Sequence, residues 1–373
     1  MSSSQELYNR IVHTLAGLVS VSHIAQLSNW AWLTVGIMQA QSVTLGSIVT
    51  YLPWEAQASS RVARLRRWLK NPQVQVWDLY QPLLAHVLGS AWRETHAYVI
   101  LDGLLVFGNR WQVFRLSLEH GCRAIPVAWL VVPGTGIVQA AKLSAMLERV
   151  AGFLAPRVKT VTFLADRGFR DCDWAELCQK IGWHYVIRIM RNTYLLQTEG
   201  LSARVDALVP VGANRYFQGV RLTKTGKLLT NVSVTWTAAP DRQMVVVVSD
   251  EPAGVTRLQE YALRMRVEES FRDDQSGGFD LEHTQLRDAQ RIERLLLAVA
   301  VATLWCHELG EQVLVEGDVA RRDIDPGRRR ELSVFQLGFR WLKRCLAIAV
   351  HRLHAFRAQL SPLALPPVVK APV

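Results

Sequence analysis

The chain has 373 residues, half of them hydrophobic and a fifth charged, which excludes a disordered chain and allows two or three domains. Its 43 lysines and arginines outnumber 32 acidic residues, and the resulting formal charge of +11 favours a polyanionic partner. The five cysteines lack paired spacing, which excludes a disulfide framework and a zinc cluster, and the N-terminus lacks a signal-peptide pattern; we therefore expect a cytoplasmic protein.

The first 95 residues are predicted to be helical. An apolar helix is expected at 22–40, followed by a basic helix that begins at Ser59 or Ser60 and ends before Pro72. The basic helix carries cations and no acid: Arg61, Arg64, Arg66, Arg67 and Lys70. A solvated surface would explain this composition, but the absence of acids favours contact with phosphate groups.

A sheet is predicted after residue 95, where the hydrophobic period changes from helical to extended. Strands are expected at 98–102, 111–118, 126–132, 161–166 and 184–189, with helices at 140–154 and 173–181. Three consecutive strands followed by helix–strand units predict an α/β fold with a mixed sheet covered by helices.

A β-rich insertion is predicted at 193–252, because the runs RYFQGVRL, LLTNVSVTW and MVVVVS are typical of strands. Helices return at Val255 and at 288–309, where the apolar run Leu295 to Cys306 is too short to span a membrane and is expected to be buried core. The remaining residues, 311–373, are predicted to form a basic linker, a helix at 333–360 and an extended proline-rich tail.

Three acids are candidates for a shared site. Asp102 and Asp166 each occupy the last position of an apolar strand, and both would emerge at one edge of the sheet if these strands are neighbours. Glu268, on a helix packed across the sheet, would complete the cluster. Three close carboxylates favour a hard divalent cation, and two Mg²⁺ ions would suit reactions at a phosphodiester. A turn or capping role is the alternative for each aspartate.

The helix that begins at Val255 is predicted to carry the stretch 261–275, which contains Glu268. Helical spacing brings Tyr261, Arg264, Glu268 and Gln275 onto one stripe, while Leu263, Val267 and Phe271 form an apolar stripe beside it. An ordinary charged surface helix has the same composition. What distinguishes the two interpretations is whether the rest of the chain supplies partners for Glu268.

These residues resemble a known family. The chain is similar to bacterial insertion-sequence cut-and-paste transposases of the Asp-Asp-Glu class, in the group with the Tyr-x2-Arg-x3-Glu-x6-Lys signature. That signature corresponds here to Tyr261, Arg264 and Glu268, with Gln275 where lysine is expected. The contexts LADRGF around Asp166 and ILDG around Asp102 fit the same pattern, as does the following strand HYVIRI.

The resemblance implies a ribonuclease H-like core at 96–192 that is interrupted by the insertion at 193–252 and completed at 253–310. Residues 1–95 would recognise the DNA ends, with contacts from Arg61, Arg64, Arg67 and Lys70. Asp102, Asp166 and Glu268 would be catalytic and would hold two Mg²⁺ ions, which Mn²⁺ could replace. Tyr261, Arg264 and Gln275 would contact DNA. Because Gln275 is uncharged, it cannot make the charge-assisted phosphate contact that the lysine of the signature would make.

The implied activity is magnesium-dependent cleavage at transposon ends, followed by transfer of the 3′-hydroxyl into target DNA. The implied partners are double-stranded DNA and a second copy of the chain in a synaptic homodimer, so the protein would associate with the nucleoid when bound to DNA. Two alternatives remain open. One is a catalytically inactive DNA-binding protein derived from a transposase, and the other is a metal-dependent nuclease without strand transfer.

Overall fold

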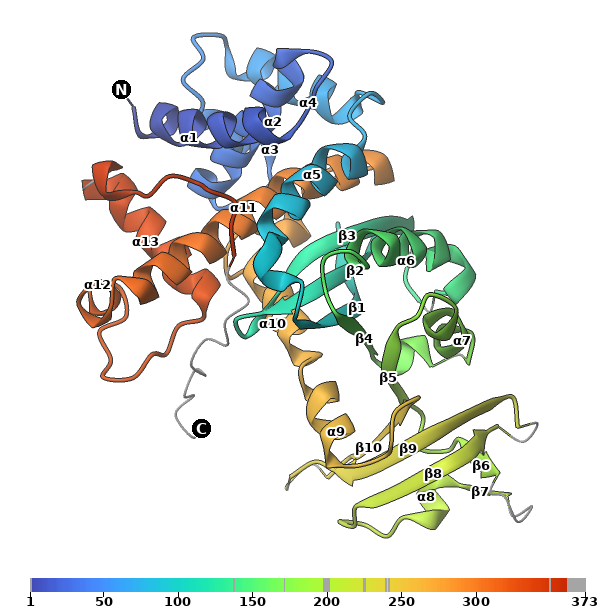
Figure 1. The fold of residues 1–373 in the computed structure, drawn as a ribbon. Coiled ribbons are helices and arrows are strands. Elements are labelled where there is room, and N and C mark those ends of the chain that lie inside the picture. Colours follow the sequence, from blue (N-terminus) through green and yellow to red (C-terminus); the bar gives the residue numbers. More distant parts are fainter. Residues whose placement is uncertain are drawn as a thin grey trace.

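The structure is a computed structural model that describes residues 2–136, 138–170, 172–196, 202–223, 226–238, 240, 242–348 and 350–360. The predicted proline-rich tail, 361–373, lies outside the described residues. Figure 1 shows three parts along the molecule: a cap of N-terminal helices, a central sheet with helices on both sides, and a further group of strands at the opposite end.

One mixed sheet contains all ten strands of the described chain. Their order is β3-β2-β1-β4-β5-β10-β9-β8-β6-β7. The pairs β1–β4 and β4–β5 are parallel, whereas the other neighbouring pairs are antiparallel. The strands are β1 His96–Val106, β2 Trp111–His120, β3 Arg123–Pro133, β4 Thr160–Ala165, β5 His184–Ile189, β6 Tyr194–Leu196, β7 Ser202–Arg204, β8 Arg215–Leu222, β9 Leu228–Trp236 and β10 Met244–Ser249.

The predicted α/β class with a mixed sheet is confirmed, and several elements begin and end where the sequence predicts. These are β5, β8, β9, β10 and the helix α6 Ala140–Leu154. The predicted insertion does not form a separate sheet in this arrangement. Its last strand, β10, pairs with β5, so the central sheet continues into the inserted strands.

Helices cover both faces of the sheet (Figure 1). On one side, α6 packs on β3 and α7 Cys172–Lys180 packs on β5. On the other side lie α9 Val255–Ala262, α10 Met265–Asp274 and α11 Ala289–Val315. Every residue from Leu295 to Cys306 in α11 is buried, which confirms the prediction of a core helix.

The N-terminal region is helical, as predicted, and packs on α11. Its helices are α1 Ser3–Leu18, α2 Ile24–Ala40, α3 Leu45–Ile48, α4 Ala58–Lys70 and α5 Val76–Leu88, with short 3-10 turns η1 Val49–Tyr51 and η2 Ser90–Trp92. Apolar side chains of α2 and α4 meet α11, so one helix belongs to the cores of both the cap and the sheet. The N-cap of the basic helix α4 is Gln57, two or three residues before the predicted Ser59 or Ser60.

The C-terminal prediction is wrong in extent. The expected basic linker contains a short helix, α12 Asp318–Arg322, and the last long helix, α13 Val334–Ile348, ends twelve residues before Leu360. The described chain after it runs back along α11 and the N-terminal helices, where the side chains of Leu353 and Phe356 are buried. The remaining short helices are α8 Val205–Leu208, η3 Arg167–Phe169, η4 Leu281–His283 and η5 Val350–Arg352. In the described residues, no helix has the length and hydropathy of a membrane span.

Candidate active site

Asp102 and Asp166 lie side by side at one position of the sheet. The parallel pairing of β1 with β4 ends at Leu101 and Ala165, and each aspartate is the next residue of its chain. The prediction that the two strands are neighbours is therefore confirmed. Both carboxylates leave the sheet at the same edge because the two strands run in the same direction.

Asp102 is not the last residue of its strand, which corrects the sequence interpretation. β1 continues to Val106, paired only with β2, so Asp102 faces Arg115 across the antiparallel ladder. The sequence was misleading because Gly103 resembles a strand-ending residue. In the structure a Cβ at Gly103 would lie 2.9 Å from Gln112 Nε2 and 3.3 Å from a carbon of the Phe114 ring, so glycine makes room for side chains of β2.

The predicted helix at 261–275 is two helices. α9 ends at Ala262 and α10 begins at Met265, and the junction is closed by hydrogen bonds of 3-10 spacing from Arg264 N to Tyr261 O and from Val267 N to Arg264 O. Val267 and Phe271 are buried, as predicted for the apolar stripe. Tyr261 lies at the end of α9, Arg264 lies in the junction as the N-cap of α10, and Glu268 lies in the first turn of α10. Each of the three interacts with one of the two aspartates.

Arg264 connects two of the three acids. Its Nη1 lies 3.0 Å from Asp102 Oδ2, and its Nη2 lies 2.5 Å from Glu268 Oε1. The arginine side chain is only 6% exposed, whereas that of Glu268 is 37% exposed. One buried guanidinium thus bridges a carboxylate of the sheet and a carboxylate of α10, and its bond to Asp102 is better shielded from water than its bond to Glu268.

Asp166 is bound by other residues of the site. The Tyr261 hydroxyl donates to Asp166 Oδ1 at 2.9 Å, and Arg188 Nη1 lies 3.7 Å from the same oxygen. Burial raises the pKa of Asp166, but this effect is outweighed by the backbone N–H of Arg167, then by Arg264 and the Tyr261 hydroxyl, so the pKa lies below its ordinary value. Asp166 is therefore a stable anion.

The pKa of Asp102 is shifted in the opposite direction. Burial is the main cause and raises it, with further increases from Glu268 and Asp166, while Arg264 and the backbone N–H of Gly103 lower it. Burial also raises the pKa of Tyr261 to about 12, so its hydroxyl is a hydrogen-bond donor at neutral pH. The two aspartates thus differ in their readiness to accept a proton, although they are adjacent on the sheet.

Buried ion pairs fix α10 against the sheet. Arg115 of β2 pairs with Asp274 at the end of α10, and both side chains are at most 4% exposed. Next to them, Arg123 Nε lies 2.7 Å from Asp273 Oδ2, and Gln336 of α13 donates to the other oxygen of that carboxylate. These contacts determine where the helix lies and therefore where Glu268 lies.

The chemistry of the three acids fits a hard divalent cation. A hollow of about 130 Å³ borders both aspartates, between Gly103, Gln112 and Gly168. Carboxylate oxygens are the donors that Mg²⁺ prefers, and Glu268 and Asp166 both raise the pKa of Asp102, so the three negative charges act on one another. The metal-ligand role of Asp102, Asp166 and Glu268 stays a prediction, because Arg264 supplies the positive charge in this arrangement.

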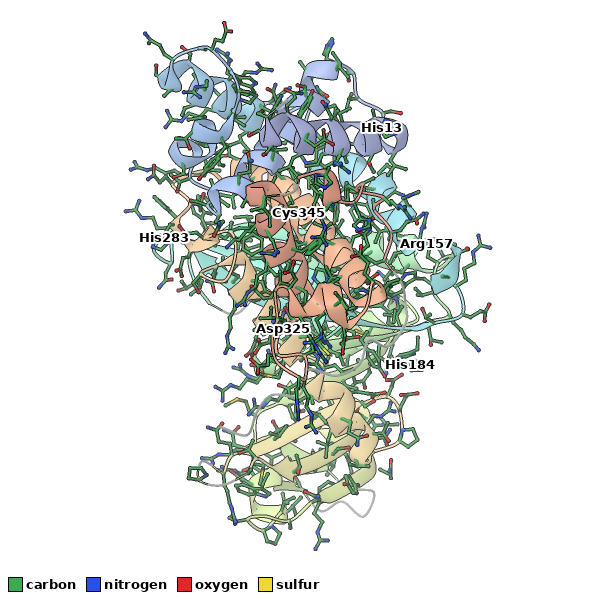
Figure 2. All side chains as sticks on the ribbon, turned by 90° about the vertical axis from the view of Figure 1, so that its left-hand side faces the viewer. His13, Arg157, His184, His283, Asp325 and Cys345 are labelled. Carbon is green, nitrogen blue, oxygen red and sulfur yellow. The ribbon has the colours of Figure 1, made fainter. Side chains whose placement is uncertain are left out.

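Another acidic group lies outside this site. Within the described residues, Asp280, Glu282 and His283 form the one cluster whose ligand atoms all lie within 4.8 Å of one another. His283 is at the outer edge of the molecule (Figure 2), and Glu282 is exposed. Hydrogen bonding of His283 to Asp280 raises the pKa of the imidazole, which accounts for this contact as a surface ion pair.

Only some of the residues predicted to contact DNA have exposed side chains; others bind groups within the protein. Gln275 follows the last residue of α10 with a backbone conformation outside the helical region, so the stripe from Glu268 ends there. In the basic helix, the Arg61 guanidinium donates to the carbonyls of Val49 and Leu52. Arg64 binds the side chain of Asn29 and lies over the Trp54 ring. The exposed cations of this helix are Arg66, Arg67 and Lys70. Their contact with DNA stays a prediction.

Sequence reasoning missed Arg188 and the pair of Arg115 with Asp274. Arg188 follows Ile187, which is the register partner of Ala165, so β1, β4 and β5 present Asp102, Asp166 and Arg188 at consecutive places of the sheet edge. A charged residue within the apolar strand HYVIRI is the signal that could have identified Arg188. The pair of Arg115 with Asp274 has no local signal, because 159 residues separate its members.

Comparisons with known proteins found similarity to transposases. No curated protein matches the chain. A piggyBac transposase in a synaptic complex with hairpin DNA, solved by cryo-EM, is similar over 94% of this chain and 80% of that one, with a TM-score of 0.45 and 12% identity. Residues 137–305, which contain Asp166 and Glu268 but not Asp102, match the family model described as the transposase DDE domain.

Proposed function

We propose that the chain is a transposase of the Asp-Asp-Glu class that cuts DNA at the ends of a mobile element and joins the freed 3′-hydroxyl to target DNA. The observation that carries this proposal is the convergence of Asp102, Asp166 and Glu268 on the pair formed by Tyr261 and Arg264. The match of residues 137–305 to the transposase DDE domain supports it. The insertion-sequence type with the tyrosine, arginine and glutamate signature belongs to the same proposal.

The core of this enzyme is of the ribonuclease H-like type. The order β3-β2-β1-β4-β5, with three antiparallel strands followed by two parallel ones, supports this assignment. The acids would occupy the first strand, the end of the fourth strand and a helix across the sheet. The strands of the insertion then delay the helix that carries Glu268 without disturbing the first two acids.

The residues of the site have distinct roles in this proposal. Asp102, Asp166 and Glu268 would hold two Mg²⁺ ions, with Mn²⁺ as a substitute. When bound, such ions activate a water or a 3′-hydroxyl for in-line attack and stabilise the leaving oxygen. The Tyr261 hydroxyl keeps Asp166 oriented and ionised, and Arg264 neutralises charge between the acids before it contacts DNA phosphates.

DNA is the partner that the charge distribution supports. The surplus of 11 positive charges attracts a polyanion, and the exposed cations of α4 would contact the DNA ends. A synaptic homodimer would bring two such ends together, with the C-terminal helices at the contact between the copies.

A cleavage assay tests the proposal. The full-length protein is mixed with labelled duplex DNA that carries the ends of its element, in Mg²⁺ or in Ca²⁺. We expect cleavage and joined products in Mg²⁺ only, and a loss of about 10³-fold or more in rate for Asp102→Asn, Asp166→Asn and Glu268→Gln, with DNA binding retained. Glu148→Gln, a change at an exposed pair with Lys180, is the matched control and should cleave normally.

The two alternatives give different products. A nuclease without strand transfer would release ends in Mg²⁺ but never join them to a target duplex. An inactive DNA-binding protein would retain the ends without cutting them in either metal. Unchanged cleavage by any one of the three acid variants would remove that residue from the metal site.

A further inference from the structure

Arg264 occupies the position between the acids at which positive charge is needed. It is bonded to Asp102 and to Glu268. Its guanidinium carbon lies over the aromatic ring of Tyr261, 5.7 Å from the ring centroid. The buried Nε–H has no partner among the residues that the structure describes. The guanidinium therefore bonds to both carboxylates through its Nη atoms, while its buried Nε–H makes no hydrogen bond to the described residues. Because an unpaired buried donor costs free energy, this position of the guanidinium is one that a better cation can replace.

We propose that Arg264 is an internal counter-cation that competes with divalent metal for Asp102 and Glu268 and leaves them when metal is bound. This inference rests on the proposed function, because it assigns the same acids to the metal. It adds that the described arrangement is a resting state, in which a residue of the chain itself neutralises the acids and reduces their affinity for metal.

The physical basis is competition for the same oxygens and repulsion between like charges. A guanidinium that binds Asp102 Oδ2 and Glu268 Oε1 removes these atoms from the ligands open to metal, and a cation held there repels a divalent ion strongly in a buried setting. The exchange needs no change of fold. Arg264 stands at the N-cap of α10 on a long side chain, so rotation about its own torsions frees both acids.

The competition is measurable without DNA. Mn²⁺ is titrated into the full-length protein by isothermal calorimetry for the wild type, Arg264→Met, Asp102→Asn and a control, Arg272→Met. The control removes a positive charge from the same helix at a side chain that is 67% exposed and bonded to Glu269. We expect Arg264→Met to bind Mn²⁺ about tenfold more tightly or better, and Arg272→Met to bind as the wild type does.

Thermal unfolding provides the second measurement and checks the fold of the variant. Without metal, Arg264→Met should melt at a lower temperature than the wild type because Asp102 and Glu268 lose their ion-pair partner, and Mn²⁺ should raise its Tm by more than that of the wild type. If the methionine variant does not fold, Arg264→Lys replaces it, since an ammonium keeps the charge but cannot bridge both acids, and its Mn²⁺ affinity should exceed that of the wild type.

The outcomes separate this inference from the proposed function. Equal or weaker Mn²⁺ binding by the Arg264 variant, with binding abolished in Asp102→Asn, would overturn the counter-cation role and leave the metal site intact. Such a result would make Arg264 an organiser of the ligands. Failure of every variant and of the wild type to bind Mn²⁺ at millimolar concentration would instead overturn the metal-dependent function.

Discussion

The hydrogen bond from Tyr261 to Asp166 contributes to the ionisation of one acid of the site, together with the backbone N–H of Arg167 and the charge of Arg264. Its length of 2.9 Å and the burial of Tyr261 make it a strong contact to an ionised carboxylate. Arg188 lies 3.7 Å from the same oxygen but is less well placed, so the phenol is the better of the two contacts from side chains to that atom. A carboxylate held in this way resists protonation in mildly acidic solution.

Replacement of this phenol should change how metal binding depends on pH. Asp166 has a lowered pKa in the folded protein, and Tyr261→Phe removes one of the causes, so the pKa should rise toward its ordinary value. Because metal needs the ionised acid, Mn²⁺ affinity measured between about pH 3 and pH 6 should decline at a higher pH than in the wild type, in addition to the decline that protonation of Asp102 causes in both proteins.

Tyr98→Phe is the matched control for this experiment. The Tyr98 hydroxyl donates to Glu260 at 3.3 Å and is bonded to none of the three acids of the site. Its replacement should leave the pH dependence of Mn²⁺ binding unchanged. A Tyr261→Phe profile that coincides with that of the wild type would show that the phenol does not govern the ionisation of Asp166.

Among the elements, helices α11 and α13 cross in close contact at two glycines. Gly310 of α11 and Gly338 of α13 lie at the crossing, where a Cβ on Gly338 would overlap with the carbonyl of Cys306 and a Cβ on Gly310 with that of Val334. The two backbones therefore touch without intervening side chains. Because Gln336 of α13 also binds Asp273, this crossing contributes to the placement of α10.

Addition of one methyl group should separate these helices. Gly338→Ala should reduce the free energy of unfolding by about 3 kcal/mol or more, since the overlap involves backbone that cannot rotate away. Gly152→Ala in α6 is the matched control, because a Cβ there meets no atom within 4 Å and alanine is the better helix former. It should stabilise the protein by about 0.5–1 kcal/mol. Urea unfolding measures both, and equal stability of the two variants would contradict the crossing.

The elements also show how much the sequence could predict. Strands such as β5, β9 and β10 were predicted to the residue because each is an apolar run bounded by turn residues. The break between α9 and α10 was missed, because Leu263 and Arg264 keep dihedral angles near the helical region and the apolar period continues across it. The end of β1 was missed because the pairing partner that extends it, β2, is not visible in a local pattern.

The candidate site shows the same division between local and long-range information. The acids, Tyr261 and Arg264 were recognisable from their residue types and spacing. The bond of Arg264 to Asp102 was not, because it joins residues 162 positions apart and depends on how α10 lies on the sheet. Contacts of this kind follow from tertiary packing, which one sequence does not reveal.

At the scale of the whole molecule, the last described segment joins the two ends of the chain. The carbonyl of Phe356 accepts from Thr14 of α1, the carbonyl of Leu360 accepts from Trp92, and Glu308 of α11 accepts from the N–H groups of Arg357 and Ala358. Residues 350–360 therefore connect the cap of N-terminal helices to the central helix. The carboxyl group of Glu308 accepts backbone hydrogen bonds from two consecutive residues of this segment, Arg357 and Ala358.

That carboxyl group makes the stability of the molecule depend on pH. Burial raises the pKa of Glu308 to about 7, against the lowering effect of the backbone N–H groups and Arg357. The folded protein then binds a proton more tightly than the unfolded chain, whose glutamate has a pKa of about 4.5. The stabilisation that proton binding by Glu308 gives the folded protein is complete below the glutamate pKa of the unfolded chain. It is lost as the pH rises through about 7, and the loss amounts to about 3 kcal/mol of unfolding free energy.

Glu308→Gln tests this at the level of the whole chain. The amide carries no titrating proton, so the loss of unfolding free energy between about pH 5 and pH 8 should become smaller than in the wild type by about 2–3 kcal/mol. Urea unfolding at several pH values measures the difference. Glu148→Gln, at an exposed pair on α6, should retain the wild-type dependence. Parallel curves for Glu308→Gln and the wild type would show that other buried acids govern the response and that the C-terminal segment is held independently of proton binding.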